Sequence, residues 1–130
     1  ELRAAGVGGP EWRAAFGDRP PAVIHSFSGP VDYAEEVLAL GLAISFSGLV
    51  FRAGEEPSAE VARLVPADRL LVETDSPYLA PPAAPRRRNE PAFVALTAGW
   101  LAERRGDDPE ALGAALITSY DRCFRAGGPS

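Results

Sequence analysis

Three short apolar runs constrain the fold of this chain more than any other feature of its sequence. They occupy residues 22–27, 42–46 and 70–75, and each is followed by a turn that contains Ser, Gly or Pro. Runs of this length between such turns are typical of buried strands. Segments with helical spacing of apolar residues separate the runs, so we expect right-handed βαβ units and an α/β fold with a parallel sheet.

Four helices are predicted around these strands. Asp32, Ser58 and Asp108 are suitable N-cap residues, and Gly41 and Pro66 stand where helices are expected to end. The predicted helices span residues 32–41, 58–65, 89–106 and 108–124, and residues 1–19 are expected to form a loop or a frayed helix. The side chains predicted to face the core from the last two helices are Phe93, Leu96, Trp100, Leu101, Leu112, Leu116 and Phe124.

Length and composition indicate one modest domain. The chain has 130 residues, of which 46% are hydrophobic, so a disordered polypeptide is excluded. No apolar run approaches the roughly 18 residues of a membrane span, and the N-terminus does not resemble a signal peptide, so we expect a cytoplasmic protein without membrane contact. Cys123 is the single cysteine, which excludes an internal disulfide and favours a core position.

Two scarce residue types bear on function. The chain contains no methionine, so we expect that residue 1 is not the natural start and that the chain is a fragment or a processed product. It contains one histidine, which limits the metal chemistry that a single copy can support. The net charge of −5 predicts that any nucleic acid would need a local basic patch or metal ions in order to bind.

Polar residues at the ends of two predicted strands are candidates for a metal site. Side-chain alternation places Glu73 and Asp75 on one face of their strand, and His25 on the face of Val23 and Phe27. Imidazole and carboxylate ligands together suit zinc, manganese or magnesium. The alternatives are that Asp75 only begins a turn and that His25 is a hydrogen-bonded core residue.

A basic segment follows the third strand. Arg86, Arg87, Arg88 and Asn89 precede a predicted helix, where guanidinium and backbone N–H groups could bind a phosphate. The alternative is a solvated arginine run in which Asn89 serves only as a cap.

Four motifs, in order, resemble the TatD family of metal-dependent deoxyribonucleases. They are His-Ser-Phe-Ser-Gly at 25–29 and the segments at 41–48, 69–81 and 88–91. The resemblance implies a TIM-type (β/α)8 barrel of roughly 250 residues. Residues 1–130 would then be a single partial domain, the C-terminal half of this barrel, with about three βα units plus a closing helix. The resemblance also implies that His25 and Asp75 are metal ligands, that Asp75 is catalytic and that Glu73 supports the site.

The sequence departs from the family pattern at the metal site and in the basic loop. The family's His-x-His pair, bridging glutamate and other ligand histidine precede the matched region, so one copy of this chain cannot complete a site expected to hold two ions. Ser26 stands where the family has cysteine or alanine, and the family's His-Arg-Gly-Lys loop is Ala84-Pro85-Arg86-Arg87 here.

The resemblance implies a parent protein that hydrolyses phosphodiester bonds in DNA with metal-activated water. One alternative is a metal-dependent barrel hydrolase of another ester or amide. Another is an incomplete fragment, inactive alone, that self-associates or pairs with a missing N-terminal half.

Overall fold

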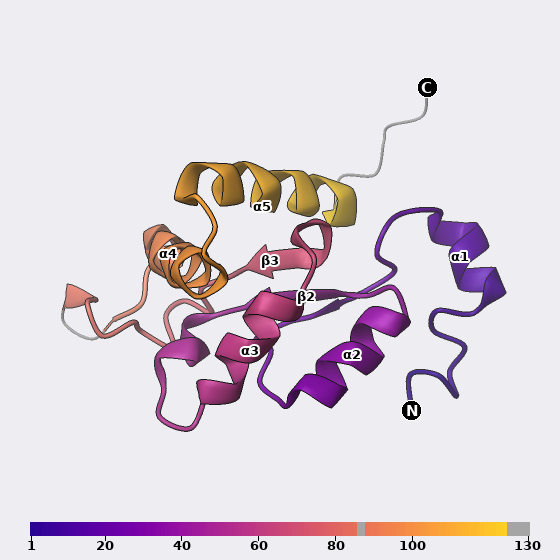
Figure 1. The fold of residues 1–130 in the computed structure, drawn as a ribbon, viewed down its shortest axis with the longest axis horizontal. Coiled ribbons are helices and arrows are strands. Elements are labelled where there is room, and N and C mark those ends of the chain that lie inside the picture. The colour runs from indigo at the N-terminus through magenta and orange to yellow at the C-terminus, as the bar shows by residue number, and fades with distance from the viewer. Residues whose placement is uncertain (86–87, 125–130) are drawn as a thin grey trace.

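Three parallel strands form the centre of the structure, a computed structural model that describes residues 1–85 and 88–124 (Figure 1). The strands are β1 (Val23–Ile24), β2 (Ala43–Phe46) and β3 (Leu70–Val72), in the spatial order β1-β2-β3. In the register, Ile44 pairs with Ile24 on one side and with Leu70 on the other. The predicted α/β fold with a parallel sheet is therefore confirmed.

The strands are shorter than predicted because the backbone turns sharply beyond the first and third. Ser26 has φ 47° and Asp75 has φ 55°, values that non-glycine residues adopt uncommonly. Some pairing continues past the strand ends, since the Phe27 N–H donates to the Ser45 carbonyl at 2.9 Å and the Glu73 N–H to the Phe46 carbonyl at 2.9 Å. A left-handed residue at these points interrupts the two-residue alternation of side chains.

In the described residues, five α-helices accompany the strands, and most begin near the predicted positions. They are α1 (Pro10–Phe16), α2 (Val31–Ala39), α3 (Glu56–Leu64), α4 (Val94–Arg105) and α5 (Pro109–Phe124). Asp108 accepts a hydrogen bond from the Ala111 N–H at 3.4 Å, as an N-cap should. The other two predicted caps are wrong: α2 is preceded by Pro30, and Ser58 lies inside α3, where its hydroxyl donates to Glu55 at 3.0 Å.

The helices bury a core in which Phe27, Phe46, Leu42, Ile44, Leu70 and Leu101 are the largest enclosed side chains. Figure 1 shows α5 beside β3, and the helices adjoin one another in the order α2, α3, α4 and α5. The predicted burial of two residues is wrong. Leu96 is exposed, because α4 buries Thr97, Leu101 and Ala102 instead, and Phe124 at the end of α5 is 57% exposed. No helix in the described part of the chain is long and apolar enough to cross a membrane.

Arg105 links α4 to the C-terminal end of α3. The Arg105 side chain is 11% exposed and forms an ion pair with Asp107 at 2.6 Å. Its guanidinium also donates to the carbonyls of Ala62 and Val65, at 2.5 and 2.7 Å, at the C-terminal end of α3. Carbonyls at a helix end have no partner within the helix, so Arg105 supplies one from α4.

Candidate metal centre at the strand ends

His25, Glu73 and Asp75 come together beyond the carboxyl ends of the parallel strands. Each offers one ligand atom, and these atoms lie within 4.8 Å of one another. His25 directly follows β1 and Glu73 directly follows β3, so the two outer strands of the sheet supply the cluster. Ligands of open α/β sheets bind at this edge.

His25 is the most accessible member of the cluster. Its side chain is 81% exposed, and its Nδ1 lies 3.6 Å from Oε1 of Glu73, which is longer than a hydrogen bond. The prediction that His25 shares a face with Phe27 is wrong, because Phe27 is buried in the core at 1% exposure. The left-handed Ser26 between them directs the two side chains to different environments.

Asp75 is held by a residue that the sequence reasoning did not select. The Ser26 hydroxyl donates to Oδ2 of Asp75 at 2.8 Å, and it lies 2.7 Å from the hydroxyl of Ser47. Glu73 and Asp75 are close as predicted, but β3 ends at Val72, so the turn and not strand alternation places them together. The available signal for Ser26 and Ser47 was a small polar residue at the end of two neighbouring strands.

Asn89 fastens the turn that follows Asp75. Its side chain is 3% exposed, and its amide nitrogen donates to the carbonyls of Thr74 and Tyr78. The predicted phosphate contact through this amide would compete with both hydrogen bonds. The Tyr78 N–H also donates to the Asp75 carbonyl at 2.8 Å, which closes the turn.

The same loop lies against the end of β2. Gly48 begins a 3-10 turn (Gly48–Phe51), and a Cβ added at this position would overlap the carbonyl oxygen of Leu79. Leu79 itself has φ 55°. The close approach of two backbones therefore requires glycine at position 48 for reasons of space.

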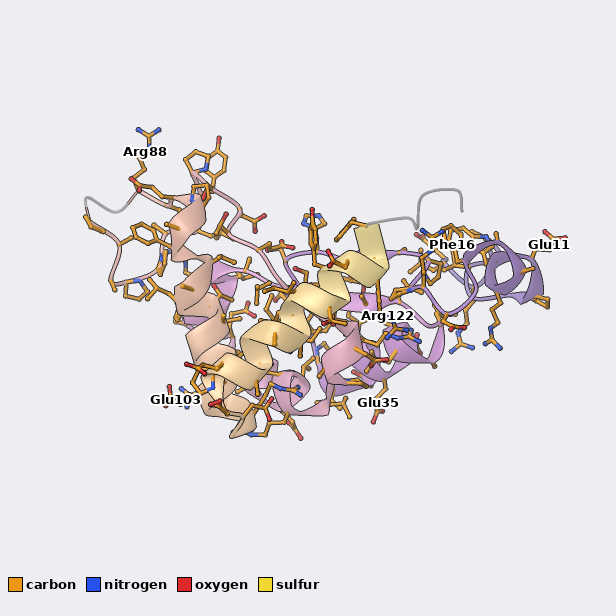
Figure 2. All side chains as sticks on the ribbon, turned by 90° about the horizontal axis from the view of Figure 1, so that it is seen from above. Glu11, Phe16, Glu35, Arg88, Glu103 and Arg122 are labelled. Atoms are coloured by element: carbon orange, nitrogen blue, oxygen red, sulfur yellow. The ribbon has the colours of Figure 1, made fainter. Side chains whose placement is uncertain are left out.

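The predicted arginine patch is described only at one residue. Arg88 is exposed, and Figure 2 shows its side chain extending away from the body of the molecule. Arg86 and Arg87 lie outside the described residues.

The donor set of the cluster fits a divalent cation. Oε1 of Glu73 is buried and accepts no hydrogen bond from the residues that the structure describes. A buried carboxylate oxygen without a partner is costly, and a cation is one remedy. One imidazole and two carboxylates are ligands that zinc, manganese or magnesium accept.

Comparisons with known proteins place the chain in a family. A family model described as "TatD related DNase" matches residues 12–125. The 3'-5' ssDNA/RNA exonuclease TatD of Erwinia billingiae is 45% identical over 112 residues, which cover 82% of this chain and 42% of that protein. An Escherichia coli protein named "Uncharacterized metal-dependent hydrolase YcfH" is 42% identical over 102 residues, which cover 78% of this chain and 38% of that protein. The chain thus spans about two fifths of the length of these relatives.

Solved structures show the same fold. The TatD homologue YjjV of Escherichia coli superposes with a TM-score of 0.73 at 26% identity, covering 82% of this chain and 41% of that one. A TatD family hydrolase of Entamoeba histolytica superposes with a TM-score of 0.70 at 20% identity, covering 80% of this chain and 42% of that one, and shows the fold alone. The three parallel strands and their helices are thus part of a (β/α)8 barrel. Since the family model also extends over most of the sequence, the chain belongs to the TatD related DNase family.

Proposed function

We propose that the parent protein of this chain is a metal-dependent hydrolase that cleaves phosphodiester bonds in DNA. The observation that carries the proposal is the convergence of His25, Glu73 and Asp75 at the strand ends. Family membership supports the reaction class. The relative from Erwinia billingiae is named for its action on single-stranded DNA and RNA, so single-stranded DNA is the substrate to test first.

His25 and Asp75 are the proposed ligands of a magnesium, manganese or zinc ion, and two ions are proposed for the complete site. Glu73 is proposed to support the site, since Oε1 of its carboxylate lies 3.6 Å from Nδ1 of His25. When bound, the cation polarises a phosphoryl oxygen and lowers the pKa of water.

The remaining chemistry belongs to side chains of the protein. Asp75 is the proposed catalytic base, which accepts a proton from the attacking water. Arg86, Arg87 and Arg88 are proposed to bind phosphate groups of the DNA, and Asn89 is proposed to position their loop through the carbonyls that it holds. A local basic patch is needed because the chain as a whole carries a net charge of −5.

We further propose that this chain alone is an incomplete enzyme of the cytoplasm. His25 is its only histidine, and its relatives are more than twice its length. In the described residues, β1 and β3 each pair with β2 alone, so each presents one open strand edge. Open edges favour self-association or pairing with the rest of the barrel.

Manganese binding and hydrolysis of single-stranded DNA together test this proposal. We expect the purified chain to bind Mn²⁺ in a titration followed by electron paramagnetic resonance, and Asp75→Asn to weaken binding at least tenfold. Asp32→Asn is the matched control, because Asp32 is exposed on α2, and it should bind as the wild type does. Equal binding by all three chains would overturn the metal site.

The DNA assay then separates the two parts of the proposal. Absence of cleavage by a folded, manganese-binding chain is expected if the chain is incomplete. Metal-dependent cleavage that Asp75→Asn abolishes would support the reaction and contradict the incomplete site. Metal-dependent cleavage that survives Asp75→Asn would contradict the assigned role of Asp75.

A further inference from the structure

Two left-handed residues from distant parts of the sequence meet at the proposed metal site. Ser26 and Asp75 both have positive φ, neither is glycine, and their side chains are joined by a hydrogen bond across 49 positions. Such backbone conformations cost free energy and persist where the surroundings hold them. The Ser26–Asp75 contact is therefore a feature that the fold maintains against a local cost.

The direction of the hydrogen bonds follows from the number of protons available. A serine hydroxyl carries one proton, and Ser26 donates its proton to the carboxylate of Asp75 at 2.8 Å. In the 2.7 Å hydrogen bond between the hydroxyls of Ser26 and Ser47, the donor must then be Ser47. Ser47 is fully buried and itself accepts from the Leu49 N–H at 3.2 Å, so its hydroxyl oxygen is fixed in place.

These contacts form a series of hydrogen bonds that runs from the turn after β2 to the carboxylate of Asp75. Leu49 donates to Ser47, Ser47 to Ser26, and Ser26 to Oδ2 of Asp75. Within the described residues, Oδ1 of Asp75 accepts no hydrogen bond, so this series occupies one carboxylate oxygen and leaves the other available. A hydrogen bond to a charged acceptor is stronger than one between neutral groups.

We propose that Ser26 is a positioning residue, which acts through Asp75 by fixing the rotamer of its carboxylate for cation binding. The inference rests on the proposed function, because it concerns the same site. Alanine at position 26 cannot donate a hydrogen bond, and the carboxylate would then be free to rotate. Partners that orient metal ligands typically change metal affinity by about 10- to 100-fold when they are removed.

The test compares Ser26→Ala with Ser28→Ala. Ser28 lies two residues away and its hydroxyl donates to Glu55 at 2.9 Å, so its removal deletes a serine hydroxyl without touching Asp75. We expect Ser26→Ala to weaken Mn²⁺ binding by about tenfold and Ser28→Ala to leave it unchanged. In the Asp75→Asn background, Ser26→Ala should cause no further loss, because the residue acts through the carboxylate.

A second measurement requires no metal. In the chain without added cations, three-bond couplings of Asp75 measured by nuclear magnetic resonance should report one χ1 rotamer in the wild type and in Ser28→Ala. They should report rotamer averaging in Ser26→Ala. Ser26→Gly serves where Ser26→Ala fails to fold, because glycine accepts the left-handed backbone without strain.

The outcomes separate this inference from the proposed function. An unchanged Asp75 rotamer, or unchanged Mn²⁺ affinity, in a folded Ser26→Ala chain would overturn the positioning role. A further tenfold loss in the Asp75→Asn background would also overturn it, since Ser26 would then act independently. A wild type that shows the fixed rotamer but binds no Mn²⁺ would overturn the proposed function instead.

Discussion

The helices that pack on the sheet and the loops beyond its strand ends are held by different forces. Around α3, α4 and α5, contacts are mainly apolar, with Leu101, Leu112 and Leu116 buried. Beyond the strand ends, hydrogen bonds predominate, such as those of Ser26 to Asp75 and of Asn89 to the following turn. Apolar burial contributes to the stability of the whole domain, whereas these polar contacts select one local conformation.

This difference separates stability from site geometry. We expect substitutions among the packed helices to lower the free energy of unfolding and to leave the cluster of His25, Glu73 and Asp75 in place in the folded fraction. Substitutions in the strand-end loops should move the cluster at a smaller cost in stability. Four predictions address the contrast.

The largest effect is expected from Leu101→Ala. The Leu101 side chain is fully buried on α4, and its truncation should lower the free energy of unfolding by about 3–4 kcal/mol. Urea unfolding followed by tryptophan fluorescence measures the change. Ile117→Ala is the control, since Ile117 is 67% exposed on α5 and should cost less than about 0.5 kcal/mol. A large loss at Ile117 would show that α5 is covered in solution.

Arg105→Met should be the next most destabilising. It keeps the aliphatic stem but leaves the carbonyls of Ala62 and Val65 without their donor, at a cost of about 2–3 kcal/mol. Arg104→Met is the control, because the ion pair of Arg104 with Glu103 is exposed and 3.6 Å long. If both variants unfold at the same urea concentration, the hydrogen bonds of Arg105 to α3 contribute nothing to stability. The contrast between the packed helices and the strand-end loops would then be weaker.

Asn89→Ala should act locally. The loss of its amide leaves the carbonyls of Thr74 and Tyr78 without this donor, so we expect a cost of about 1–2 kcal/mol and a looser turn. Hydrogen exchange at the Tyr78 amide, which donates to the Asp75 carbonyl, should accelerate at least tenfold. The neighbouring Glu90→Ala, at an exposed residue, should leave that rate unchanged. Equal exchange in the wild type and Asn89→Ala would contradict the role assigned to this amide.

The smallest effect concerns Cys123, at the edge of the packed helices. Burial raises the pKa of its thiol, while the nearby charges of Arg122 and Arg69 lower it. A thiol with a raised pKa in the folded state stabilises that state below the pKa of the unfolded chain, and the contribution is lost as pH rises above it. We therefore expect the wild type, relative to Cys123→Ser, to lose stability as pH rises through about 9. The difference in urea midpoint between the two chains, measured at several pH values, should shrink over that range. A constant difference would contradict the raised pKa.

The sequence predicted the elements whose signals are local. Apolar runs and turn residues located all three strands, and because parallel strands end at one edge, His25 and Asp75 were expected to meet there. The assignment of these residues as metal ligands, and of this part to the C-terminal half of the barrel, stays a prediction.

Contacts between distant residues were beyond sequence reasoning. The left-handed residues Ser26 and Asp75 are joined by a hydrogen bond, and a single contact across 49 positions leaves no periodic pattern in the sequence. The same holds for Asn89. Its position after the arginine run suggested a phosphate contact or a helix cap, whereas the structure buries its side chain among loop carbonyls.

The close approach of Gly48 to Leu79 has an evolutionary consequence. Because any side chain at position 48 would displace the Leu79 carbonyl, one added methyl group there would shift the loop that precedes the arginines. Variation at position 48 would thus alter the path of this loop without changing any residue of the His25, Glu73 and Asp75 cluster. Relatives that carry alanine here are expected to differ in the length or path of that loop.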